Sequence, residues 1–228
     1  MQDFSVCLEP MNSLTEENYL KALFNLSDTR GEVNVNELSK HLGIKMPTVT
    51  SMMKKLAEKG LVHYESYKPL RLTGSGKSEA GKIIRKHRLT EMYLVKIMGF
   101  GWHEVHHIAE QVEHIHAPAF FSRMDEMLGF PRIDPHGSPI PDRDGNIVQA
   151  QFIRLSECRP GDQLKVCAVM HSGDEFLQFL NSRGIQLGLI IQVISREKFD
   201  GSVTVRYEPG RTEMFTQAAA EWLAGEKI

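Results

Sequence analysis

The sequence predicts a mainly α-helical protein with a smaller β part: an N-terminal winged helix-turn-helix, a helical middle and a small C-terminal β-barrel. Through about residue 128, apolar residues recur three and four positions apart, as on one face of a helix. From Gln149 they recur at every second position, as in strands. The chain has 228 residues, of which 41% are hydrophobic. It can therefore form several domains with apolar cores, and its composition excludes a disordered or collagen-like protein.

Three helices and a hairpin are expected in the first 74 residues. The first helix covers residues 14–26, with Thr15 as a candidate N-cap. The second ends at Gly43, a residue type common at helix C-termini, and the third begins near Pro47, which suits a first helical turn. Two helices joined by a short turn containing glycine have helix-turn-helix spacing. Residues 61–73 predict two short strands, the wing beside this unit.

Three more helices are expected in the middle of the chain. They cover residues 75–98, residues 102–116 and a segment that starts at Pro118. The last of them is a candidate dimer contact. Residues 131–147 contain four prolines, which is typical of a linker or an ordered loop.

The C-terminal part predicts a small all-β barrel with one helix. Strand-like runs cover residues 151–170, 188–199 and 202–208, and turn sequences separate them. The helix is expected over residues 174–185, between the first two runs.

The ends and the cysteines bear on location. No segment approaches the about 18 consecutive apolar residues of a membrane span, and the N-terminus lacks the features of a secretory signal. We therefore expect a cytoplasmic protein with no membrane partner. Cys7, Cys158 and Cys167 form no C-x-x-C pair, which argues against a zinc ribbon and an oxidising compartment. The sequence leaves open whether translation starts at Met1 or Met11.

Positive charge is concentrated in one segment. Residues 40–88 contain twelve Lys or Arg and three Glu, a net charge of +9, whereas the whole chain carries −2. Beside a helix-turn-helix, such a block indicates double-stranded DNA as the partner. Hydroxyls and lysines on the third helix lie off its apolar stripe, where they could meet base edges and phosphates. The alternative is a helix face that is only solvated. The candidate DNA contacts are Lys45, Pro47, Thr48, Thr50, Ser51, Lys54, Lys55, Lys68 and Arg71.

Histidines and glutamates form two stripes just after this segment. His87 and Glu91 are four residues apart and share a helix face, and a second face carries His106, Glu110, Glu113 and His114. Burying so many carboxylates and imidazoles is costly unless they are paired or bind a cation. Oxygen and nitrogen ligands without thiolate favour Mn(II) or Fe(II) over Cu(I), and Zn(II) could also occupy such a site. The alternative is that the stripes are structural or face solvent.

The sequence contains no complete enzyme motif of the kinds considered. Residues 74–78 resemble the end of a phosphate-binding loop, but Arg71 stands where that motif requires glycine. There is no H-E-x-x-H sequence and no recognisable Ser or Cys nucleophile. We expect a protein that is not an enzyme; a small metallohydrolase is the weakest alternative.

Three further motifs reveal a resemblance. They are R-K-H-R-L-x-E at Arg85–Glu91, V-x-x-x-A-E-x-x-E-H at Val105–His114 and P-H-G-x-P-I-P at Pro135–Pro141. Together with the winged helix they resemble the diphtheria toxin repressor family of iron- or manganese-responsive transcriptional regulators. The resemblance implies a DNA-binding domain over 1–74, a helical metal-binding and dimerisation domain over 75–140, a linker over 141–148 and an SH3-like domain, similar to FeoA, over 149–228.

The resemblance also implies metal ligands. It places the family's primary site on Asn18, Glu110, Glu113 and His114, and its ancillary site on His87, Glu91 and His106. Further ligands are expected from Glu175 and from Asp134 with His136. Glu110 makes the chain similar to the manganese-responsive members, because the iron-responsive ones carry Cys there. Asn18, where Met or Asp is usual, and Lys21, where two-domain manganese regulators carry Glu, depart from the pattern.

The function implied is metal-gated repression of metal-uptake genes by a homodimer that binds a palindromic operator. Mn(II) is the expected cofactor, Fe(II) the alternative, and Zn(II) could substitute in vitro. The runner-up functions are an iron-dependent regulator of the same family and a winged-helix regulator that metal does not gate.

Overall fold

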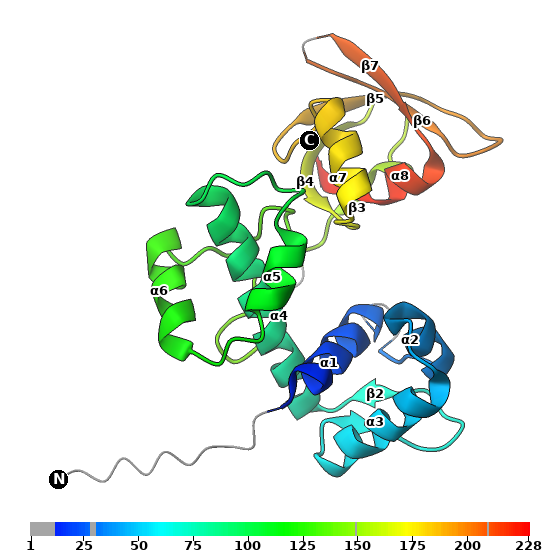
Figure 1. Ribbon diagram of the computed structural model, residues 1–228. Helices are drawn as coiled ribbons and strands as arrows, with labels where there is room; N and C mark the ends of the chain where they lie inside the picture. The colour runs from blue at the N-terminus through cyan, green and yellow to red at the C-terminus, as the bar shows by residue number, and fades with distance from the viewer. Residues whose placement is uncertain (1–11, 28–30, 149, 209) are drawn as a thin grey trace. The chain divides into compact units, whose positions relative to one another are not determined.

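The computed structural model describes residues 12–27, 31–148, 150–208 and 210–228. The two candidate start residues, Met1 and Met11, lie outside this part of the chain. The chain divides into two compact units (Figure 1). Unit 1 comprises the described residues up to Arg85 together with Pro141–Asn146, and unit 2 comprises Lys86–Ile140 and the described residues of Ile147–Ile228.

Unit 1 contains the helices and the hairpin predicted for the first 74 residues. They are α1 (Leu14–Ser27), α2 (Val35–Leu42), α3 (Met46–Glu58), β1 (Val62–His63) and β2 (Arg71–Leu72), followed by the first part of α4 (Gly74–Lys96). Their apolar faces share one core that includes Leu20, Leu38 and Met53. Gly43 ends α2 in the left-handed conformation, with φ 65°. The winged helix-turn-helix prediction is confirmed.

The start of α1 differs from the prediction. The helix begins at Leu14, so Thr15 lies inside its first turn and is not the N-cap. Ser13 caps the helix instead: the Glu16 N–H donates to Ser13 Oγ at 3.3 Å, and the Ser13 N–H donates to Glu16 Oε2 at 2.7 Å. This reciprocal pair is a capping box. Serine and threonine both suit an N-cap, so residue type alone does not choose between them.

Residues 141–146 pack against α4 within unit 1. A Cβ added at Gly81 would lie 1.9 Å from the carbonyl oxygen of Gly145, so the two backbones are in direct contact. Ser78 Oγ donates to the Asp144 carbonyl at 2.5 Å, and Arg85 Nη1 donates to the Pro141 carbonyl at 2.6 Å. This part of the proline-rich segment is an ordered loop on α4.

The helices of unit 2 are the rest of α4, α5 (His106–Val112) and α6 (Pro118–Leu128). The predicted helix over 102–116 is shorter in the structure and starts at His106. The reason lies in the C-terminal part of the unit: Trp102 and His103 contact Asn181 there instead of joining the helix.

The C-terminal part of unit 2 is one six-stranded sheet with the strand order β3-β8-β4-β5-β6-β7. All neighbouring strands are antiparallel. The elements are β3 (Ile153–Arg154), η1 (Leu155–Glu157), β4 (Gln163–Val169), α7 (Asp174–Ser182), β5 (Ile190–Arg196), β6 (Val203–Tyr207), β7 (Arg211–Phe215), α8 (Gln217–Glu221) and β8 (Leu223–Lys227). Leu177 and Leu180 of α7 share the core with Val193 and Phe215 of the sheet.

No strand is predicted after residue 208, yet β8 lies inside the sheet, between β3 and β4. Gly225 allows this, because a Cβ there would lie 1.9 Å from the Lys165 carbonyl oxygen. The predicted C-terminal β part is confirmed as this six-stranded sheet, and within 150–208 and 210–228 no strand pairing joins β3 to β7 to close it. Among the described residues, no helix combines the length and the apolar character needed to span a membrane.

Candidate metal centre and DNA-binding surface

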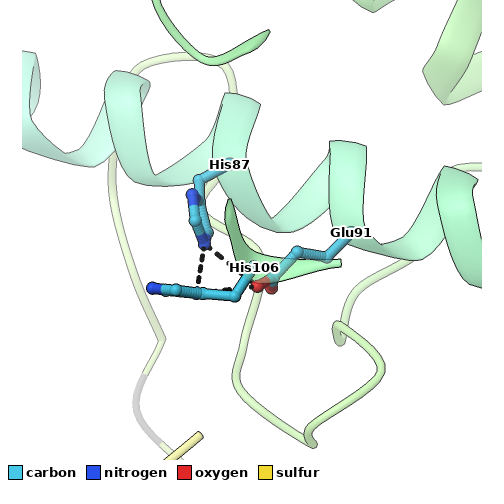
Figure 2. Close-up of side chains that lie close together, drawn as sticks. All are labelled: His87, Glu91 and His106. Carbon is cyan, nitrogen blue, oxygen red and sulfur yellow. Dashed lines mark hydrogen bonds and ion pairs between the residues drawn. The ribbon is translucent and has the colours of Figure 1, made fainter. Parts of the chain in front are cut away.

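Three ligand-type side chains meet where α4 faces the start of α5 (Figure 2). His87 and Glu91 lie one turn apart on α4, and His106 is the first residue of α5. His87 Nε2 lies 3.0 Å from Glu91 Oε1 and 3.2 Å from His106 Nδ1, and His106 Nδ1 lies 3.2 Å from Glu91 Oε1. The three atoms form a nearly equilateral triangle.

The hydrogen bond between His87 and Glu113 determines which ring nitrogen of His87 has a lone pair that points into this triangle. His87 Nδ1 lies 2.5 Å from Glu113 Oε2, and because an ionised carboxylate only accepts, Nδ1 carries the hydrogen. Nε2 of a neutral His87 therefore directs a lone pair at Glu91 and His106, and such lone pairs repel unless a proton or a cation lies between them. Atoms bound to one divalent ion at about 2.1 Å are separated by about 3 Å. The triangle has these dimensions, so the residues present fit a divalent metal.

The charge of Glu91 supports the same conclusion. Its side chain is 2% exposed. Burial alone would raise the pKa of Glu91, but the His106, His136 and His87 imidazoles hold that pKa well below its ordinary value. A carboxylate that stays ionised in the interior requires positive charge beside it, which protonated imidazoles or a metal ion would supply.

A second cluster uses the other oxygen of Glu91. His136 Nδ1 lies 3.5 Å from Glu91 Oε2, and Asp134 completes a buried group whose three ligand atoms all lie within 4.8 Å of one another. Asp134 Oδ1 accepts the backbone N–H groups of His136 and Ser138 at 2.8 and 2.9 Å. Burial and the charge of Glu91 raise the pKa of Asp134 against the opposing effect of Arg88. Glu91 thus belongs to both clusters, with one oxygen in each.

The surface of α3 has the character expected of a recognition helix. Val49, Met53 and Leu56 are buried in the core of unit 1. Thr50 is half-buried, and the candidates that face solvent are Lys45, Pro47, Thr48, Ser51, Lys54 and Lys55. Hydroxyls and lysines are therefore displayed on the side of α3 away from the core.

Several of the basic candidates have acidic partners. On the hairpin, Lys68 Nζ lies 2.8 Å from Glu65, and Arg71 Nη2 lies 2.6 Å from Glu32. Both basic side chains remain more than 60% exposed, so they stay accessible to a phosphate.

Lys55 has a buried partner, Glu16 of α1. Glu16 Oε1 lies 3.3 Å from Lys55 Nζ and 2.8 Å from Lys59 Nζ. Burial alone would raise the pKa of Glu16, but the two lysines and the Ser13 N–H lower that pKa to about 2. The pairing holds α3 against α1.

Three family models match successive parts of the chain. "Iron dependent repressor, N-terminal DNA binding domain" covers residues 11–70, "Iron dependent repressor, metal binding and dimerisation domain" covers 73–142, and "FeoA domain" covers 153–221. The iron-dependent repressor IdeR of Mycobacterium leprae is 30% identical over 165 residues, which are 68% of this chain and 72% of the relative. The chain belongs to the diphtheria toxin repressor family of metal-dependent repressors.

Other members of the family are similar over more of their length. The diphtheria toxin repressor of Corynebacterium glutamicum is 27% identical over 216 residues, 90% of this chain and 93% of that protein. A solved manganese-dependent transcriptional repressor in complex with manganese is 32% identical, with a TM-score of 0.86 over 93% of this chain and 100% of that one. The structure of ScaR with bound Cd²⁺ is 29% identical, with a TM-score of 0.82 over 93% and 99% of the two chains.

Family membership establishes the general function. This repressor has a DNA-binding domain and a metal-binding and dimerisation domain, so DNA and a second copy of the chain are its partners. It is a transcriptional repressor and not an enzyme. Its relatives carry names that refer to iron or to manganese.

The structure of this repressor brings together five of the ten predicted metal residues, in the two clusters around Glu91. Glu113, at the end of α5, is buried and is the partner of His87 Nδ1. Glu110 is 54% exposed, with Oε1 3.5 Å from His106 Nε2, and His114 Nε2 lies 3.6 Å from Glu113 Oε1.

Two predicted ligands lie elsewhere in the chain. Asn18 lies on α1 of unit 1, and Glu175 is exposed in the first turn of α7. Their roles as ligands stay predictions.

Sequence reasoning missed two groups that support the second cluster. The Trp102 carbonyl lies 2.8 Å from His136 Nε2, and Arg88 Nε lies 3.5 Å from Asp134 Oδ2. Arg88 adjoins His87 in the basic segment, which was a usable signal. No sequence signal marked Trp102, because a backbone carbonyl accepts a hydrogen bond whatever the residue type.

Proposed function

We propose that this repressor responds to manganese, and that Mn(II) gates the binding of its homodimer to a palindromic operator upstream of metal-uptake genes. The observation that carries the proposal is the ligand chemistry of the two clusters around Glu91, which combine carboxylate oxygen with imidazole nitrogen and contain no thiolate. Such ligands suit Mn(II) and also Fe(II). Zn(II) could fill the same positions in vitro.

Glu110 favours manganese over iron. In the family this position is Cys in iron-responsive members and Glu in manganese-responsive ones. A thiolate is a softer ligand than a carboxylate and shifts preference away from Mn(II).

The candidate metal ligands form three sets, two of which share Glu91. Glu91 would hold metal with His87 and His106 through one oxygen and with Asp134 and His136 through the other. A primary ion would use Asn18, Glu110, Glu113 and His114, with Glu175 as an additional ligand. Metal would thereby select the arrangement of the two recognition helices that fits DNA, and it adds affinity only to the extent that it prefers that arrangement.

The domain assignment follows the same proposal. Residues 1–74 would bind DNA through α3 and the hairpin, 75–140 would bind metal and form the dimer, and 149–228 would be the SH3-like domain after a linker over 141–148.

Fluorescence anisotropy on the protein's own upstream DNA tests the proposal. Binding is measured at fixed salt with chelator, Mn(II), Fe(II) and Zn(II), since phosphate contacts make affinity depend on salt. We expect binding only with metal and the highest affinity with Mn(II). Equal binding with chelator would leave a DNA-binding protein that metal does not gate, which is the runner-up function.

Two substitutions sharpen this test. Glu91→Gln removes the carboxylate shared by two of the three ligand sets at nearly constant shape and should weaken the Mn(II) dependence, whereas Glu79→Gln, on the same helix and paired with Lys82, should not. Glu110→Cys should move the preference toward Fe(II). An unchanged metal preference in Glu110→Cys would contradict the argument for manganese.

A further inference from the structure

The loop between α4 and α5 connects a candidate metal ligand with the C-terminal sheet. His136 Nε2 lies 2.8 Å from the backbone carbonyl oxygen of Trp102. Because a carbonyl only accepts, Nε2 carries a hydrogen, so Nδ1 holds the lone pair when the ring is neutral. That lone pair faces Glu91 Oε2 at 3.5 Å. The Trp102 carbonyl therefore selects the His136 tautomer that could bind a cation through Nδ1.

Trp102 is held in turn by Asn181, near the end of α7. Trp102 Nε1 donates to Asn181 Oδ1 at 2.7 Å, and since an indole N–H only donates, the amide oxygen must face it. The amide nitrogen then faces His103 Nδ1 at 3.0 Å. One side chain of α7 thus satisfies two successive residues of the loop.

The indole of Trp102 also contacts both His136 and the core of the C-terminal sheet. Its ring is stacked on the His136 ring, with centroids 5.9 Å apart and an interplanar angle of 23°. It packs against the apolar core of the C-terminal sheet as well. The position of the Trp102 carbonyl therefore depends on α7 as well as on its own loop.

We propose that Asn181 is a positioning residue for metal binding, which holds the loop whose Trp102 carbonyl orients His136. This rests on the proposed function, because it requires that Glu91, Asp134 and His136 bind metal. The hydrogen bonds of Asn181 go to Trp102 and His103, so it acts on the candidate metal ligands through these two residues.

The hydrogen bond between His136 and the Trp102 carbonyl couples metal binding to the position of Trp102 in both directions. A cation at His136 Nδ1 withdraws electron density from the ring, which makes Nε2–H a stronger donor to the Trp102 carbonyl. By linkage, whatever secures Trp102 raises metal affinity, and bound metal secures Trp102. The C-terminal sheet thereby takes part in metal binding through α7.

The test uses the full chain with Trp222→Phe, which leaves Trp102 as the only one of the two tryptophans. Mn(II) alone is titrated, with Trp102 emission and calorimetry as the two readouts. Mn(II) should change the emission, and Asn181→Leu should weaken Mn(II) binding about tenfold and reduce the emission change.

Two variants control for a general effect on α7. Asn181→Asp should restore affinity, because a carboxylate accepts from the Trp102 indole and from His103 in its other tautomer. Gln178→Ala, an exposed change on the same helix, should bind Mn(II) as the parent does. Circular dichroism of the metal-free proteins checks that each is folded.

The variants distinguish the positioning role of Asn181 from metal binding by the second cluster itself. A folded Asn181→Leu with parental affinity and emission change would overturn the positioning role, and so would an Asn181→Asp as weak as Asn181→Leu. His136→Ala tests the site itself: parental Mn(II) binding there would mean that the second cluster is not a metal site. If His136→Ala loses binding while Asn181→Leu keeps it, only the role of Asn181 fails.

Discussion

Glu16 and Glu91 are both buried carboxylates whose pKa is held low, yet their partners differ in kind. Glu16 contacts lysines, which are charged at neutral pH, so its ion pairs are complete without any ligand. Glu91 contacts three imidazoles, and an imidazole supplies positive charge only when it holds a second proton or a cation. This difference in partner chemistry, more than burial, distinguishes a structural acid from a candidate metal ligand in this chain.

Replacing Glu16 with Gln should lower the free energy of unfolding at pH 7 by about 2 kcal/mol, less than the full pKa shift implies because Lys55 is largely exposed. The pKa of Glu16 is about 2 in the folded protein against an ordinary 4.5. Its stabilisation is therefore fully present above pH 4.5 and is lost as the pH falls toward 2. Urea unfolding at pH 7 and pH 3 measures this, with Glu58→Gln on the exposed side of α3 as the control. A difference from the parent that does not shrink at pH 3 would contradict the role of the charge.

Tyr67, at the tip of the hairpin, is fully exposed and has a φ of 67°. This left-handed conformation is unfavourable for a side chain with a Cβ, by about 1 kcal/mol. Tyr67→Gly should therefore raise the free energy of unfolding by about 1 kcal/mol. Tyr67→Ala keeps the Cβ and should give no such gain, so urea unfolding of the two variants isolates the conformational cost. Equal stabilities of the Gly and Ala variants would count against strain at this position.

Among the elements, α4 serves both units of the structure. Its first half contributes Ala80 and Ile83 to the core of unit 1, and its second half carries His87 and Glu91. The sequence predicted this helix well because its apolar residues keep helical spacing over many turns. It did not predict that α5 would be short, because the residues before His106 are held by a distant side chain, Asn181.

Gly81→Ala tests the contact between α4 and the loop 141–146. In an exposed helix alanine would be about 1 kcal/mol more stable than glycine. Here the added Cβ would lie 1.9 Å from the Gly145 carbonyl oxygen, so we expect a loss of about 1–3 kcal/mol. Gly74→Ala, at a position with nothing within 4 Å of the new Cβ, is the matched control and should be neutral or stabilising. Thermal unfolding distinguishes the two, and a gain at Gly81 would show that the loop can move away at little cost.

At the scale of the whole molecule, metal binding is expected to add stability as well as to control DNA binding. The two clusters draw ligands from α4, α5 and the loop that contains Asp134 and His136. Segments that are distant in sequence would thus be joined through one carboxylate, Glu91. A ligand that binds only the folded state stabilises it by mass action.

Mn(II) at 100 times its Kd should therefore raise the free energy of unfolding by about 2.7 kcal/mol relative to chelator. Urea unfolding with and without Mn(II) measures this. Glu91→Gln should show a smaller gain than the parent, because only the primary set of ligands remains intact, and Glu79→Gln should show the full gain. Equal gains in both variants would place the ion elsewhere.

The sequence by itself determined the local features of this repressor. Helical spacing, Gly43 and Pro47 marked the helix-turn-helix, and the spacing of His87 and Glu91 marked half of a metal cluster, because these features depend on residues close together in the chain. The tertiary structure decided what depends on distant contacts. It placed Asp134 and His136 beside Glu91, put β8 inside the sheet through Gly225, and delayed the start of α5 to His106, after the residues that contact Asn181. Side chains and backbone groups brought together from different elements carry no periodicity, so only the folded chain shows them.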